Sequence, residues 1–151
     1  MRWSAVALSA LALLGCATDD KKSDNARSVA DPALQAIVDR VAGANRDVAR
    51  LSIHTIPAGS SRLTIVASTV PGRVGEPSDP EDLDASRTGR PVVMREGHNL
   101  DYTESVADAP NRTTAVIGVT ISGASGMTDD ALLDRAKKVA AEVAAAIRAP
   151  R

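Results

Sequence analysis

The feature that most constrains the fold is the apolar segment TAVIGVTI at residues 114–121. Most of its side chains are β-branched, which favours a strand. A strand that lacks polar residues at alternate positions is typical of the buried interior of a sheet. We therefore expect residues 114–121 to form the central strand of a β-sheet.

Four further segments have the β-branched or apolar pattern of strands. They lie at residues 51–56, 63–70, 91–95 and 100–106. The sequence PAGSSR at 57–62 has the composition of a hairpin loop, and EGHN at 96–99 predicts a turn between the third and fourth segments. Together with residues 114–121, these segments predict a five-stranded sheet.

Two segments have the apolar spacing of amphipathic helices. The first begins at Pro32, where Asp31 is a suitable N-cap and proline suits the first helical position, and should run for four or five turns. The second is capped by Thr128, carries two aspartates in its first turn and ends at Pro150. The order helix, two strands, intervening segment, three strands, helix predicts an α+β domain.

The intervening segment, residues 75–91, has five acidic residues and three prolines. A metal loop, a disordered linker and a capped helix are the alternatives. A calcium loop that starts at Asp79 would place Asp84 at the required glycine position and Arg90 at the required glutamate position, and a start at Asp82 fails in the same way. The sequence therefore lends little support to a metal site.

A short helix explains the same residues better. Asp79 suits the N-cap and Pro80 the first helical position, and acidic residues in the first turn interact favourably with the helix dipole. Gly89 can adopt the positive φ of a helix C-terminus, and Pro91 prevents continuation. We expect a helix of two to three turns between the second and third strands.

The N-terminus, MRWSAVALSALALLGC, has Arg2 followed by an apolar run that is too short to span a bilayer. This pattern predicts a signal peptide at residues 1–15. The sequence LLGC at 13–16 resembles the lipobox of bacterial lipoproteins, in which Cys16 becomes the lipidated N-terminus. The alternative is an ordinary signal peptide in which the cysteine occurs by chance.

Lipidation would attach the protein to a membrane without spanning it, since several acyl chains make a durable anchor. Residues 17–30 are polar and lack an apolar period, so we expect a lipidated flexible tether at 16–30 and one domain at 31–149. Ala17 in place of aspartate resembles the sorting pattern of lipoproteins of the outer membrane. We therefore expect an exported protein on the periplasmic side of that membrane.

Composition excludes several classes of function. Cys16 is the only cysteine, so no intramolecular disulfide is possible. Residues 16–151 have 17 basic and 19 acidic side chains without a basic stripe, which argues against nucleic acid as a partner. Phenylalanine is absent and Trp3 lies in the signal peptide, so the core must be aliphatic, with Tyr102 as the only aromatic residue of the mature chain.

Several short motifs in this order resemble the extracytoplasmic PAS-like, or Cache, sensor domains. They are IVAST at 65–69, RVG at 73–75, SDPED at 78–82, TGRPV at 88–92 and AVIGV at 115–119. The resemblance covers residues 31–148. It implies a five-stranded antiparallel sheet packed against a long N-terminal helix, with a C-terminal helix and a small-molecule pocket on the other face of the sheet.

Three residues are candidates for binding a ligand. Tyr102 can both pack and donate a hydrogen bond, although ordinary strand packing is an equal alternative. His54 alternates with apolar residues and can face a pocket or solvent. Arg73 can bind a carboxylate or be a solvated arginine near a turn. No nucleophile, base or metal set forms a catalytic motif, so we expect no enzyme activity, no cofactor and no metal.

Two functions fit these observations. The first is a non-enzymatic lipoprotein that binds a small molecule and signals through a partner protein, because the sensor domains that it resembles usually belong to receptors and kinases. The second is an accessory or structural interaction module without a ligand. This second function would use the small residues of the C-terminal helix, Ala136, Ala140 and Val143, to contact another protein.

The lipobox resemblance generates a direct prediction. Replacement Cys16→Ser removes the thiol that would carry the lipid, so the protein should be released from the membrane fraction and should no longer incorporate labelled palmitate. Fractionation and labelling in the bacterial host measure both effects. Continued lipid labelling of the variant would refute lipidation at Cys16.

Overall fold

The computed structural model describes residues 29–109, 112–123 and 126–149. The predicted signal peptide, Cys16, most of the tether and Pro150 lie outside the described residues. Within the described ranges, no helix has the length and apolar character needed to cross a bilayer. The elements are α2 (Pro32–Ala44), β1 (Val48–Thr55), β2 (Thr64–Ser68), the 3-10 helix η1 (Pro71–Arg73), α3 (Pro80–Thr88), β3 (Val92–Glu96), β4 (Asn99–Ala109), β5 (Arg112–Ile121) and α4 (Asp129–Arg148).

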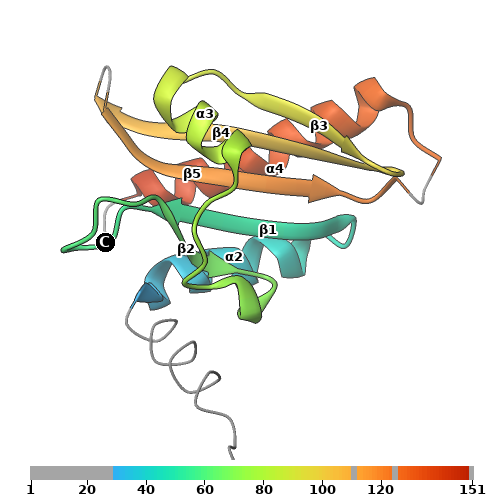
Figure 1. Ribbon diagram of the computed structural model, residues 1–151. Coiled ribbons are helices and arrows are strands. Elements are labelled where there is room, and N and C mark those ends of the chain that lie inside the picture. The colour runs from blue at the N-terminus through green and yellow to red at the C-terminus, as the bar shows by residue number, and fades with distance from the viewer. Residues whose placement is uncertain (1–28, 110–111, 124–125, 150–151) are drawn as a thin grey trace, which may run out of the picture.

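The five strands form one antiparallel sheet in the order β2-β1-β5-β4-β3 (Figure 1). The predicted α+β fold with a five-stranded antiparallel sheet is confirmed. The segment TAVIGVTI lies in β5, between β1 and β4, so its predicted central position is also confirmed. In this register Gly118 of β5 is opposite Ser52 on one side and Thr103 on the other.

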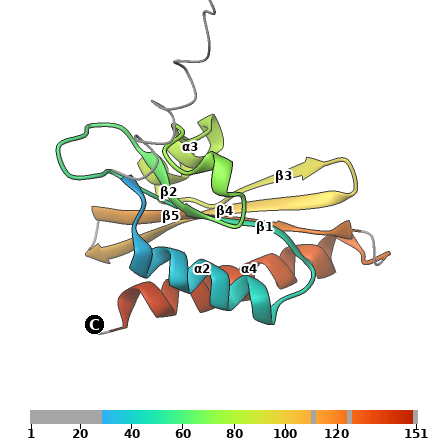
Figure 2. The same cartoon turned by 90° about the horizontal axis from the view of Figure 1, so that it is seen from below.

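Helices cover the two faces of the sheet unequally. Figure 2 shows α2 and α4 side by side on one face, while α3 lies on the other. We call these the helix face and the α3 face. The main core lies between the sheet and the two long helices. It is almost entirely aliphatic, as the composition requires, and its largest fully buried side chains include Leu51, Ile53, Ile117, Ile121, Leu132, Val139 and Val143.

The helix ends follow from local hydrogen bonds. Asp31 accepts from the amides of Ala33 and Leu34 at 2.9 and 3.0 Å, and Thr128 accepts from Ala131 at 3.3 Å, which confirms both predicted N-caps. Helix α2 ends at Ala44, earlier than the apolar spacing predicts.

The early end of α2 has a visible cause in Asn45 and Asp47. The side-chain amide of Asn45 donates to the Val41 carbonyl at 2.7 Å and so replaces a helical backbone bond. Arg135 of α4 donates to both carboxylate oxygens of Asp47, at 2.6 and 2.8 Å, and to Asn45 Oδ1 at 2.6 Å. These contacts fix the turn, so Val48, which fits the helical spacing, instead begins β1.

The helix predicted within residues 75–91 is also present. Helix α3 runs from Pro80 to Thr88, and its C-cap Gly89 has a positive φ of 67° as predicted. At its start, Asp82 Oδ2 accepts from the Asp79 amide at 2.9 Å. The acidic segment is therefore a capped helix in the described structure.

The segment before α3 is fixed to the edge of the sheet. We call residues 75–78 the strap. Along it, the Gly75 and Ser78 amides donate to the carbonyls of Ile65 and Leu63 at 2.9 and 3.1 Å, and the Ile65 amide donates to Glu76 at 3.0 Å. The strap covers the outer edge of β2 and carries the chain onto the α3 face.

The small residues of α4 pack inside the domain and do not form a surface for another protein. Ala136, Ala140 and Val143 are completely buried within the domain, where α4 packs against β4 and β5. They form no free surface, so the idea that they contact another protein is wrong. Their small size is explained by close packing of the helix on the sheet.

The aliphatic core generates a prediction about stability. Ile117 is fully buried in β5, whereas Ile56 is 58% exposed. Ile117→Ala should lower the free energy of unfolding by about 2–5 kcal/mol because it leaves a cavity in the core. The matched change Ile56→Ala should alter it by less than about 0.5 kcal/mol. Urea denaturation of both variants measures the difference, and equal losses would contradict the described core.

Candidate functional site

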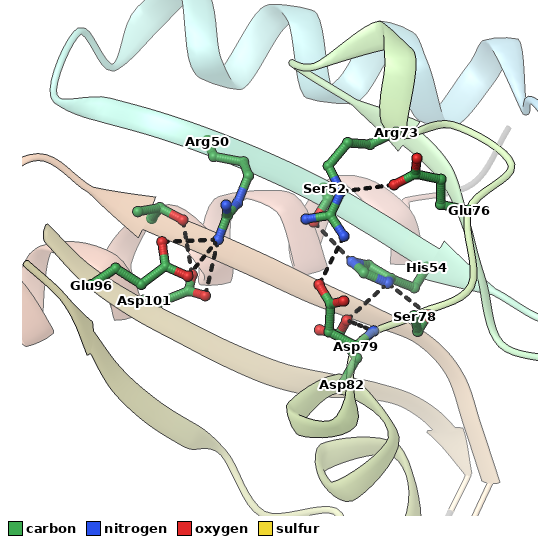
Figure 3. Close-up of polar contacts among 11 residues, drawn as sticks. Arg50, Ser52, His54, Arg73, Glu76, Ser78, Asp79, Asp82, Glu96 and Asp101 are labelled. Atoms are coloured by element: carbon green, nitrogen blue, oxygen red, sulfur yellow. Dashed lines mark hydrogen bonds and ion pairs between the residues drawn. The ribbon is translucent and has the colours of Figure 1, made fainter.

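The α3 face carries a layer of polar side chains, unlike the helix face. Strand β1 alternates, so Leu51 and Ile53 enter the main core while Arg50, Ser52 and His54 point to the α3 face. Figure 3 shows these side chains together with residues from the strap and from α3. Several of them are buried, although they carry charge or hydrogen-bonding groups.

His54 lies at the centre of one cluster and is only 2% exposed. Its Nε2 is 2.8 Å from Ser52 Oγ, and its Nδ1 is 2.8 Å from Ser78 Oγ and 3.3 Å from Asp82 Oδ2 (Figure 3). The imidazole therefore connects β1, the end of the strap and the first turn of α3. Both ring nitrogens have partners, as a buried polar group requires.

Asp82 is the member contributed by α3 and is 4% exposed. The same oxygen, Oδ2, accepts from the Asp79 amide and lies against the His54 ring. One carboxyl group thus starts the helix and attaches it to the sheet. An acidic residue in a first helical turn is typical of capping alone, so no sequence pattern indicates that this side chain faces inward.

Burial shifts the pKa values of this pair in opposite directions. It lowers the pKa of His54 to about 4, with the positive charge of Arg73 acting in the same sense. It raises the pKa of Asp82 to about 7, with a further contribution from the nearby charges of Glu81 and Asp79. Both shifts disfavour charge at a buried site, so between these values the imidazole is neutral and the carboxyl carries the proton.

Gly118 makes room for this cluster. A Cβ atom at this position would lie 3.0 Å from Ser52 Oγ, 3.8 Å from His54 Nε2 and 4.0 Å from Asp82 Oδ1. The central strand therefore has no side chain where the polar groups of β1 and α3 meet. On the far side of Gly118, in β4, Thr103 is 2% exposed.

A second cluster lies farther along the same face. Arg50 Nη2 is 3.2 Å from both Glu96 Oε1 and Asp101 Oδ2, and Asp101 Oδ1 accepts from the Thr120 hydroxyl at 2.9 Å (Figure 3). Burial raises the pKa of Asp101, while the Thr120 hydrogen bond and the charge of Arg50 oppose that rise. Asp101 is thus a second buried carboxyl group on the α3 face.

Arg73 connects η1 to the start of α3. Its Nε donates to Glu76 Oε2 at 3.3 Å and its Nη2 to Asp79 Oδ2 at 2.8 Å (Figure 3). The Asp79 hydrogen bond is the main cause that raises the pKa of Arg73. Because its side chain is 26% exposed, Arg73 lies at the rim of the polar layer.

Of the three predicted ligand residues, the structure brings two to the same face. His54 and Arg73 lie on the α3 face. Tyr102 is opposite Val119 of β5 and packs in the main core on the helix face, where its hydroxyl donates to Glu104 at 2.8 Å. Burial is the main cause that raises the pKa of Tyr102, and the hydrogen bond to Glu104 raises it further. Tyr102 is therefore an ordinary packed residue of the strand, which was the alternative to a ligand-binding role.

The distances around Ser52 resemble the Ser–His–Asp arrangement of hydrolases. Ser52 is only 7% exposed, and its backbone is within the ladder of β1, where amides are engaged in strand pairing. The Asp82 carboxyl belongs to the helix that covers the site. A substrate would have to displace α3, and this would remove Asp82 from His54, so the arrangement does not support hydrolysis.

A metal cluster and a surface cavity are the alternatives to the polar layer as a functional site, and both have less support. Among the described residues, no three His, Cys, Asp or Glu side chains are placed to share a metal ion. A cavity of about 370 Å³ lies beside the 57–62 loop and the strap, and its lining includes Pro57, Arg62, Thr64 and Pro77. None of the three predicted ligand residues lines this cavity. The polar layer is therefore the stronger candidate site.

Comparison with known proteins supports the fold. No family model matches the sequence, and no curated protein does so. A solved GAF domain from an Acinetobacter phosphoenolpyruvate-protein phosphotransferase is 16% identical, with a TM-score of 0.51 over 89% of this chain and 94% of that one. The A. aeolicus nlh2 GAF domain in an inactive state is 10% identical, with a TM-score of 0.56 over 85% and 89%. The chain has a GAF-like fold, and the PAS-like and Cache assignments stay predictions.

The opposed pKa shifts predict how stability depends on pH. Between about pH 4 and 6.5 the folded pair holds one proton, and so does the unfolded pair, in which His54 is charged and Asp82 is not protonated. The pair should therefore add no pH dependence in this window. When either residue of the pair is replaced, the pKa shift of the remaining residue should make stability depend on pH.

In Asp82→Asn, the remaining low pKa of His54 means that the unfolded state binds more protons. Stability relative to wild type should then fall by up to about 1.4 kcal/mol per pH unit as pH decreases from 6.5 to 4. In His54→Gln, the raised pKa of Asp82 reverses the sign, and relative stability should fall as pH rises from 4 to 7. Urea denaturation across this range measures both. If stability depended on pH in the same way in both variants, the assignment of a neutral His54 and a protonated Asp82 would be contradicted.

Proposed function

We propose that this chain is a non-enzymatic ligand-binding or sensory domain whose binding site is the polar layer between the sheet and α3. The observation that carries the proposal is the burial of ionisable groups in an otherwise aliphatic protein. His54, Asp82 and Asp101 are each no more than 5% exposed. Burying such groups costs free energy, and groups with strongly shifted pKa values gather at functional sites.

The two faces of the sheet differ in the side chains that they bury. The helix face is packed with aliphatic side chains and provides the main core. The buried ionisable residues His54, Asp82 and Asp101 lie on the opposite face, where the PAS-like resemblance implies a small-molecule pocket. Gly118 adds a central position without a side chain, flanked by hydroxyl groups of Ser52 and Thr103.

We further propose that the domain acts at a membrane through a lipid on Cys16 and passes its signal to a partner protein. The lipobox resemblance supports the anchor, and the polar composition of residues 17–30 supports a tether between the lipid and the domain. Export to the periplasmic side of the outer membrane belongs to the same proposal.

A ligand screen tests the binding function. Midpoints of thermal unfolding should rise with amino acids, carboxylates or purines if one of these binds the native state, because binding stabilises by mass action. Gly118→Ala should abolish the rise for an active compound, since its methyl group enters the polar layer 3.0 Å from Ser52 Oγ. The matched control Gly43→Ala lies in α2 with nothing within 4 Å and should retain it.

Each variant is compared with its own ligand-free midpoint, so a change in intrinsic stability does not obscure the result. Arg73→Gln, at the rim, provides a second variant in case Gly118→Ala folds poorly. A compound that still binds both site variants with unchanged affinity would place its site elsewhere. No rise with any compound of the panel would count against a small-molecule function.

A further inference from the structure

Helix α3 is attached to the domain by few apolar contacts. Its only buried residues are Asp82 and Ala85, while Leu83 is 49% exposed. By comparison, α2 buries three large aliphatic side chains and α4 buries six apolar residues. Ala85 belongs to a small cluster separate from the main core, which consists of Leu63, Ala85 and Val116 with the partly buried Val92. The main core is therefore complete without α3.

Both ends of α3 are suited to a pivot. At its start, the strap remains bonded to β2 through backbone hydrogen bonds that do not involve α3. At its end, Gly89 has positive φ, and a Cβ atom at this position would meet nothing within 4 Å, so nothing packs against the position of that Cβ atom. Rotation at residues 79 and 89 would move the helix without breaking any pairing within the five-stranded sheet.

Two contacts between ionisable side chains at the N-terminal end of α3 join the helix to its surroundings. Asp82 Oδ2 lies 3.3 Å from His54 Nδ1, and Asp79 Oδ2 accepts from Arg73 Nη2 at 2.8 Å (Figure 3). The first contact is buried and joins α3 to the sheet. The second is at the rim, where Asp79 is 43% exposed and solvent weakens the interaction. Of these two contacts, the buried one is therefore the stronger attachment of α3 to the sheet.

We propose that α3 is a hinged cover that opens as a unit while the sheet, α2 and α4 stay folded, with the His54–Asp82 contact as its latch. Opening exposes Ser52, His54 and Gly118 on the sheet. Elements with little buried apolar surface are those that open locally at the lowest free energy. Opening of this kind depends on the contacts of α3 and does not require a ligand.

Hydrogen exchange followed by mass spectrometry on the full-length protein tests the cover. Amides within the hydrogen bonds of α3, including that of Gly89 to the Ala85 carbonyl, should exchange at least about tenfold faster than amides of β5 and α4. His54→Gln changes no residue of α3, yet it should accelerate exchange in α3 by about a further tenfold. Exchange in β5 from the same sample reports global unfolding and serves as the internal reference.

Asp84→Asn is the matched control, because Asp84 is on the same helix but pairs at the surface with Arg87 at 2.7 Å. It should leave α3 exchange close to wild type. The double variant His54→Gln/Asp82→Asn should open little more than Asp82→Asn alone, because the His54–Asp82 contact is already lost in that single variant. Equal exchange rates for α3 and β5 would overturn the proposal, as would equal effects of His54→Gln and Asp84→Asn or additive effects in the double variant.

Discussion

The contact between His54 and Asp82 joins the two parts of this molecule. One part is a sheet with an aliphatic core under α2 and α4, and the other is α3 with the polar layer beneath it. Because Asp82 also accepts from the Asp79 amide, a single carboxyl group both starts α3 and attaches it to β1. The position of α3, and the closure of the layer that it covers, depend on this contact.

The position of the proton within the His54–Asp82 pair determines the charge of this contact. Two fully charged groups would lose their hydration on burial, and a fully deprotonated pair would leave an anion in a site with little solvent. Both costs are avoided when the one proton is on the carboxyl group, because the imidazole and the carboxyl are then both neutral. Gly118 allows the pair to come together, because any side chain there would occupy the space in which the groups of β1 and α3 meet.

Much of the fold is predictable because it depends on local chemistry. The continuous apolar run of β5, the caps at Asp31 and Thr128 and the positive φ of Gly89 all arise from short stretches of sequence, and each expectation was confirmed. The end of α2 was predicted too late because Asn45 and Asp47 are fixed by Arg135, which is distant in the sequence. Long-range contacts of this kind leave no local pattern.

The site was less predictable for the same reason. His54 and Arg73 were expected near a pocket, but Tyr102 lies on the helix face, and which face a strand residue takes depends on register. Asp82 has the sequence context of an ordinary capping residue, and only its packing on β1 adds a second role. The alternation of Arg50, Ser52 and His54 in β1 was the available signal for a polar face.

The protonation state of His54 is the most direct test of whether a neutral, latched pair holds α3 on the sheet. Nuclear magnetic resonance of the imidazole nitrogens, with the His54 signals identified by their loss in His54→Gln, reports the charge of the ring as pH is changed. We expect a neutral ring at pH 5.5, with both nitrogens hydrogen-bonded and a titration midpoint at a pKa of about 4. A ring that is already cationic at pH 5.5, with a midpoint near the ordinary pKa of about 6.5, would contradict this expectation.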